Sequence, residues 1–80
     1  MTARIAVVED HVLVSDALVH ELGRLGHTVV ASVSTLAAVP DTDIDLILLD
    51  LDLADGMADV DQVASWVDRG TAVLVVSALT

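Results

Sequence analysis

The stretch Leu46-Ile47-Leu48-Leu49, which ends abruptly in Asp50, is apolar at four successive positions and rich in branched side chains. Strands with this pattern are covered on both faces, as they are in a parallel sheet. Three further runs share the pattern: Ile5-Ala6-Val7-Val8, Val29-Val30-Ala31 and Ala72-Val73-Leu74-Val75-Val76. We therefore predict four buried, parallel strands.

Helical patterns lie between these runs. Over residues 12–25, apolar side chains recur every three or four positions, which gives a helix one apolar face. Either Asp10 or His11 is placed to cap its start, and Gly26 follows where a left-handed residue ends a helix. The residues expected to face inward are Val14, Ala17, Leu18, Leu22 and Leu25.

Two shorter helical pieces are also expected. One lies between Ser34 and Pro40, and the other covers residues 59–68 and is closed by Arg69-Gly70. Trp66 neighbours the apolar stripe of the second piece, and we expect it to pack partly into the core. The stripe itself is predicted to contain Val60, Val63, Ala64 and Val67.

Strands and helices therefore alternate along the chain. This order predicts right-handed crossovers and a three-layer α/β sandwich with a parallel sheet. No repeat or linker divides the 80 residues, so we expect one core.

The composition excludes several classes of protein. Thirteen Asp and Glu stand against three Arg and no Lys, which gives a formal charge of −10 and argues against direct nucleic-acid binding. An apolar content of 55% excludes a disordered tail. No apolar run approaches the roughly 18 residues of a membrane-spanning helix, so no membrane partner is expected. The absence of cysteine fits a cytoplasmic protein.

Polar side chains follow three of the predicted strands: Glu9-Asp10, Asp50 and Ser77. In an open α/β sheet, ligands bind outside the carboxyl ends of the strands. Carboxylates gathered there repel one another, and a hard divalent cation such as Mg²⁺ relieves that repulsion. Asp50 is then placed to act as a nucleophile toward a phosphoryl group, with Ser77 as a hydrogen-bond donor to it.

Three segments carry a family resemblance. Residues 4–14 contain Glu9-Asp10-His11, residues 46–56 contain Asp50-Leu51-Asp52, and residues 73–78 end in Ser77-Ala78. In this order they resemble a bacterial two-component response-regulator receiver domain, of the kind joined to a helix-turn-helix DNA-binding output domain. The resemblance covers all 80 residues and implies a flavodoxin-like sandwich with strand order 2-1-3-4.

The resemblance also implies a function and its residues. The chain would accept a phosphoryl group from a sensor histidine kinase and relay it to a transcriptional output, acting as a signalling protein rather than an enzyme. The implied site residues are the phospho-acceptor Asp50, the Mg²⁺ ligands Glu9, Asp10, Asp50 and the backbone carbonyl of Asp52, and the phosphoryl-binding and switch residues Ser77 and Ala78.

The sequence departs from the family pattern in several places. Ala54 stands where the family usually has Pro, and Ala58 where a Gly is common. The fifth strand with its essential Lys and the last two helices of the family are missing. We expect the chain to be the N-terminal two-thirds of a receiver domain rather than a degenerate one. The strand at residues 71–76 would then be an exposed edge that promotes self-association.

Other interpretations remain open from the sequence. One is a receiver-like docking domain that works without phosphorylation. Another is a haloacid-dehalogenase-type phosphatase that uses Asp50 and Asp52, although that family places its acidic pair downstream. A topoisomerase-primase-type metal fold with Glu9 fits less well, because Asp10 replaces the usual Gly. The simplest interpretation assigns no site: Glu9 and Asp10 cap a helix, and Asp50 belongs to a solvated loop.

Overall fold

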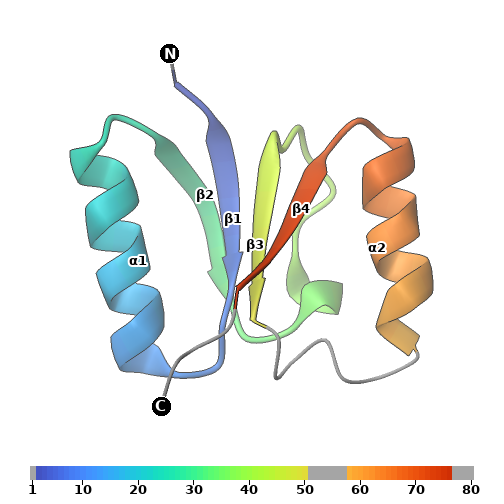
Figure 1. Cartoon of the computed structure of the whole chain (residues 1–80), viewed down its shortest axis with the longest axis horizontal. Helices are drawn as coiled ribbons and strands as arrows, with labels where there is room; N and C mark the ends of the chain where they lie inside the picture. The colour runs from blue at the N-terminus through green and yellow to red at the C-terminus, as the bar shows by residue number, and fades with distance from the viewer. Residues whose placement is uncertain (1, 51–57, 77–80) are drawn as a thin grey trace.

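A computed structural model describes residues 2–50 and 58–76 of the chain, and side chains at 2–50 and 60–76 (Figure 1). All four predicted strands and both longer predicted helices are present. In chain order the elements are β1 (Arg4–Val8), α1 (Val12–Arg24), β2 (Thr28–Val33), the 3₁₀ helix η1 (Leu36–Ala38), β3 (Leu46–Asp50), α2 (Ala58–Asp68) and β4 (Ala72–Val76). Over this part of the chain, no helix is long and apolar enough to cross a membrane.

The four strands form one parallel sheet in the order β2-β1-β3-β4, which confirms the predicted topology. In the central pair, Val8 lies opposite Leu49, and on the other side of β3 Asp50 lies opposite Val76. All strands therefore run toward the same edge of the sheet, which is the lower edge in Figure 1.

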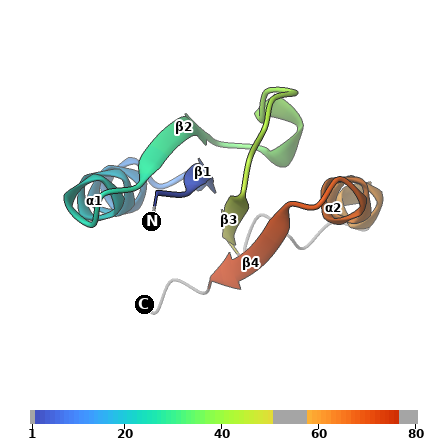
Figure 2. The same ribbon diagram turned by 90° about the horizontal axis from the view of Figure 1, so that it is seen from above.

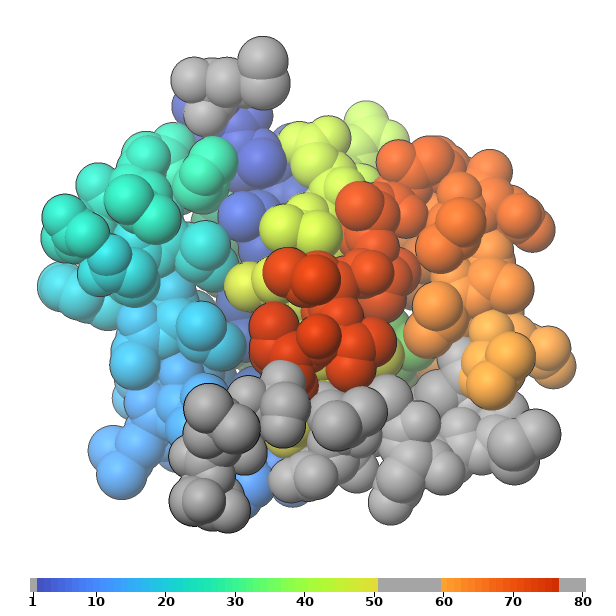
Figure 3. All heavy atoms as spheres, in the orientation of Figure 1, coloured from blue at the N-terminus to red at the C-terminus, as the bar shows by residue number. Residues whose placement is uncertain are grey.

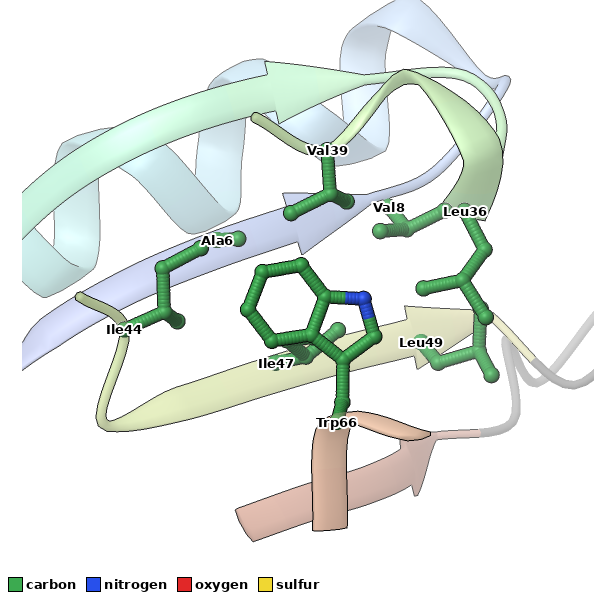
Figure 4. Close-up of a cluster of buried hydrophobic side chains, with 8 residues drawn as sticks. All are labelled: Ala6, Val8, Leu36, Val39, Ile44, Ile47, Leu49 and Trp66. Atoms are coloured by element: carbon green, nitrogen blue, oxygen red, sulfur yellow. The ribbon is translucent and has the colours of Figure 1, made fainter. Parts of the chain in front are cut away.

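The two faces of the sheet are covered by different elements. Helix α1 lies on one face, and η1 and α2 lie on the other (Figure 2). The main core cluster fills the space beneath η1 and α2, where the Trp66 side chain inserts among aliphatic residues (Figure 4). Its buried members are Ala6, Val8, Leu36, Val39, Ile44, Ile47, Leu49 and Trp66.

The predicted inner face of α2 is partly wrong. Val60 and Val67 are 58% and 53% exposed, and Ala64 is exposed as well, whereas Trp66 is only 8% exposed. Val63 alone of the predicted stripe packs against the core. Burying the indole removes more apolar surface from water than burying a valine, so the helix is turned to place Trp66 inward.

The predicted inner face of α1 is also only partly confirmed. Leu18 and Leu22 are partly buried, but Val14 and Leu25 are 37% and 58% exposed, Ala17 is exposed, and Ser15 is the buried residue of this helix. The helix packs on β1 and β2 at one side of the sheet. In the space-filling view of Figure 3, a depression separates α1 from β4, because neither element extends across the middle of this face.

Both helices end at glycines with left-handed backbone conformation, as predicted. Gly26 has φ 92° and Gly70 has φ 91°. After α1, the Gly26 and His27 amides donate to the carbonyls of Gly23 and Leu22, and α2 ends with the same paired pattern at Gly70. Side chains with a Cβ are strained at such angles, so glycine fixes both helix ends.

We predict that Trp66→Ala destabilises the chain by about 3–5 kcal/mol, because it removes the largest side chain of the core and leaves a cavity. That loss is most of the stability expected for a domain of this size. Urea unfolding followed by circular dichroism measures it. Val67→Ala on the same helix is the control and changes the stability by less than about 0.5 kcal/mol. An unchanged urea midpoint for Trp66→Ala would contradict the placement of this side chain.

Candidate functional site

The central strand pair brings two acidic residues to the same edge of the sheet. Asp50 is the last residue of β3, and Glu9 follows β1 directly. The Glu9 amide donates to the Val33 carbonyl at 2.9 Å, so the β1–β2 ladder continues through this residue. Since Val8 is level with Leu49, the next residues along, Glu9 and Asp50, are neighbours.

Four side chains meet at this edge and form what we call the acidic cluster: Glu9, Asp10, His11 and Asp50. One potential ligand atom from each lies within 4.8 Å of the others. Glu9 and Asp50 are buried, at 6% and 1% exposure, whereas Asp10 and His11 are exposed. The cluster therefore has a buried floor on the sheet and a side that faces solvent.

The structure brings together three of the predicted site residues and leaves the others undetermined. Glu9, Asp10 and Asp50 converge as expected from the strand ends. Asp52, Ser77 and Ala78 lie outside the described residues. Their implied roles stay predictions.

His11 belongs to the cluster as well, although no metal-ligand spacing in the sequence pointed to it. Its Nδ1 atom is 2.7 Å from Glu9 Oε1 and 3.1 Å from Asp10 Oδ1. The backbone amide of His11 also donates to Glu9 Oε1, at 2.9 Å. His11 occupies the N-cap position of α1, but its side chain makes no capping hydrogen bond. The one clue in the sequence is its position directly after the acidic pair.

The carboxylates change the protonation of His11. The hydrogen bond to Glu9 is the main cause that raises the pKa of the imidazole above its usual 6.5, and the charges of Asp10 and Glu9 add to it. A protonated imidazole in this place offsets part of the negative charge of the cluster. In the folded chain, His11 and its two acidic neighbours therefore act as one electrostatic unit.

The donor set of the cluster fits a hard divalent cation. Three carboxylates supply oxygen ligands, which Mg²⁺ prefers, and Mg²⁺ is commonly held by only one or two carboxylates together with water and phosphate oxygens. Three negative charges within a few ångströms also repel one another, and a cation between them removes that repulsion. The residues present therefore suit Mg²⁺.

This topology, with an acidic pair after β1 and an aspartate ending β3, defines the fold of a response-regulator receiver domain, and the chain has that fold. The crystal structure of the response regulator PhyR from Brucella abortus is similar to it, with a TM-score of 0.74 and 26% sequence identity. The similarity covers 94% of this chain and 33% of PhyR, so the chain spans about a third of that protein's length. No protein-family model and no curated protein sequence matches the chain.

We predict that Glu9→Gln lowers the pKa of His11 toward 6.5, because a neutral amide accepts a weaker hydrogen bond from the imidazolium than the carboxylate does and carries no charge. NMR titration of the His11 ring protons measures this pKa. A raised pKa in the folded chain means that His11 stabilises the fold below about pH 6.5 and that this contribution is lost as the pH rises through the raised value. Asp16→Asn, on the exposed side of α1, is the control and leaves the pKa unchanged. An unaltered titration in Glu9→Gln would contradict the pairing.

Proposed function

We propose that this chain is a phospho-acceptor module in which Asp50 receives a phosphoryl group from the phosphohistidine of a sensor histidine kinase. The observation that carries the proposal is the convergence of Asp50 with Glu9 and Asp10 at the carboxyl edge of a receiver-type sheet. Asp50 is fixed by β3, so its carboxylate has a defined position relative to the acidic pair. The same proposal places the protein in the cytoplasm, which fits its lack of cysteine.

The proposed transfer is a single displacement at phosphorus. A carboxylate oxygen of Asp50 forms the new O–P bond while the P–N bond of the donor breaks. The electron pair of the broken bond leaves with the imidazole, which takes up a proton. The product is an acyl phosphate on Asp50.

The other residues of the cluster position the reaction. Glu9, Asp10 and Asp50 hold Mg²⁺, with the backbone carbonyl of Asp52 as a further proposed ligand. When bound, Mg²⁺ offsets the charge of the carboxylates and of the incoming phosphoryl group. Because Asp50 is buried and Asp10 is exposed, the donor approaches from the side of the cluster where Asp10 lies. Binding of the phosphoryl group by Ser77 and Ala78 stays a prediction.

We predict that acetyl phosphate or phosphoramidate with Mg²⁺ adds one phosphoryl group to the chain. Mass spectrometry detects the adduct, which should resist acid and be lost in alkali. Asp50→Asn abolishes it, because the amide is a far weaker nucleophile than the carboxylate. Asp68→Asn, at the exposed end of α2, is the matched control and leaves it intact.

The other outcomes of this experiment separate the remaining interpretations. Steady turnover of phosphate esters would contradict a receiver and support a phosphatase that uses Asp50 and Asp52. The lack of any adduct would contradict phospho-acceptance and favour a docking domain. That the chain forms the N-terminal two-thirds of a receiver domain stays a prediction.

Self-association through β4 is part of the proposal. This strand is at one edge of the sheet, and Leu74 and Val75 on it are 52% and 46% exposed. An edge strand with apolar side chains pairs readily with another chain. The predicted strand began at residue 71, but Thr71 lies just before β4 and is buried, with its hydroxyl donating to the Ile44 carbonyl at 2.7 Å.

We predict that the isolated chain of 80 residues associates in solution and that Leu74→Lys reduces the association, because it places a charge on the edge strand. Sedimentation velocity measures the distribution of species. Leu13→Lys is the control, because it introduces the same charge at an apolar residue that is 86% exposed but belongs to α1 and not to the edge strand. A monomeric wild-type chain with sharp two-state unfolding would contradict this prediction.

A further inference from the structure

A pocket of about 390 Å³ lies between η1 and α2, and no residue of the acidic cluster lines it. We call it the Trp66 pocket, since the indole forms part of its wall. Leu36, Ala37 and Val39 complete the apolar side. Figure 4 shows the Trp66 ring beside Leu36 and Val39, with which it packs in the core. An aliphatic chain of a few carbons matches a wall of this kind.

The opposite side of the pocket is polar, and each of its three side chains can accept a hydrogen bond. Asp61, Gln62 and Ser65 line it, all within a little more than one turn of α2. The Oε1 atom of Gln62 is buried and accepts no hydrogen bond from any part of the chain that the structure describes. A buried acceptor that has lost water without gaining a donor is unfavourable, so a ligand that brings an N–H group is favoured here.

The negative charge of the chain, −10, favours a cationic ligand in the Trp66 pocket. The chain has no lysine, and each of its three arginines is engaged elsewhere. Arg24 pairs with Glu21, and Arg4 Nε donates to the Asp43 carbonyl. Arg69 is 2.7 Å from Asp41 and lies over the Trp66 ring, 4.2 Å from its centroid, but it does not line the pocket. None of the ion pairs among the described residues involves Asp61, so a cationic ligand would supply its first one.

We propose that the Trp66 pocket binds a lysine side chain of a protein partner. An ammonium group carries three N–H donors and no acceptor, which matches the three acceptor side chains Asp61, Gln62 and Ser65. The four-carbon stem of the lysine lies along Leu36 and Trp66. The pocket shares no lining residue with the acidic cluster, so this proposal does not rest on phosphorylation of Asp50.

The proposal is tested with the peptide acetyl-Gly-Lys-Gly-amide as the probe and the whole chain as the receptor. We expect saturable changes in Trp66 fluorescence and in the amide NMR signals of Gln62 and Ser65. Asp61→Asn and Gln62→Leu each weaken binding by roughly tenfold, since the first removes the negative charge and the second removes an acceptor for the ammonium group. Asp68→Asn removes the same charge from the same helix outside the pocket and leaves the affinity unchanged.

A second readout separates loss of the site from loss of the fold. Gln62→Leu replaces the unsatisfied acceptor with an apolar group, so its thermal midpoint should be equal to or above that of the wild type while binding is lost. Three outcomes would overturn the proposal: no saturable change with the peptide, equal binding of the peptide with acetylated lysine, or equal weakening by Asp68→Asn. Equal affinity for free butylamine would overturn the assignment to a protein partner.

Discussion

Parallel pairing between β1 and β3 determines where the chemistry of this molecule lies. From Ile5 opposite Leu46 to Val8 opposite Leu49 the register is continuous, and the residues that follow are Glu9 and, in β3 itself, Asp50. A slip of one residue would turn every side chain of a strand to the opposite face. Both strands are buried on both faces, so such a slip would spoil the fit of the packed side chains and draw a carboxylate into the apolar run. The position of the two carboxylates is therefore secured by hydrophobic packing.

The two sides of this sheet differ in how well they are closed. Beneath η1 and α2, Trp66 completes a continuous cluster of buried aliphatic residues. On the side of α1, Leu74 remains largely exposed, and the helix covers mainly β1 and β2. Exposed aliphatic surface of this extent marks a place where another polypeptide packs. The well-packed face under η1 and α2 supports the acidic cluster rigidly. The incompletely covered face that carries α1 accounts for the association that we expect at β4.

Much of the fold could be predicted because the apolar runs are continuous and short. That pattern identified β3 and its neighbours, and Gly26 and Gly70 marked both helix ends. The inner face of α2 could not be predicted, because Trp66 and the neighbouring valines form stripes that differ by a small rotation of the helix. The piece between Ser34 and Pro40 is too short for an α-helix and forms a single 3₁₀ turn.

The site was predictable to a similar extent. Glu9, Asp10 and Asp50 follow strands, and parallel topology brings strand ends together, so their convergence could be inferred. His11 could not be assigned, because its role depends on the side-chain geometry of Glu9 rather than on spacing. The Trp66 pocket was also beyond sequence reasoning, because whether Gln62 finds a hydrogen-bond partner depends on tertiary packing.

The central claim is that the sheet edge holds a divalent cation among Glu9, Asp10 and Asp50. Isothermal titration of the chain with Mg²⁺ tests it most directly, with Glu9→Gln as the variant and Glu21→Gln, an exposed carboxylate paired with Arg24 on α1, as the control. We predict one Mg²⁺-binding event, and we expect Glu9→Gln to weaken it by about tenfold or more. Even the loss of a residue that only hydrogen-bonds to a metal ligand typically lowers metal affinity by about that factor. Equal Mg²⁺ affinity in wild type and Glu9→Gln would contradict the account.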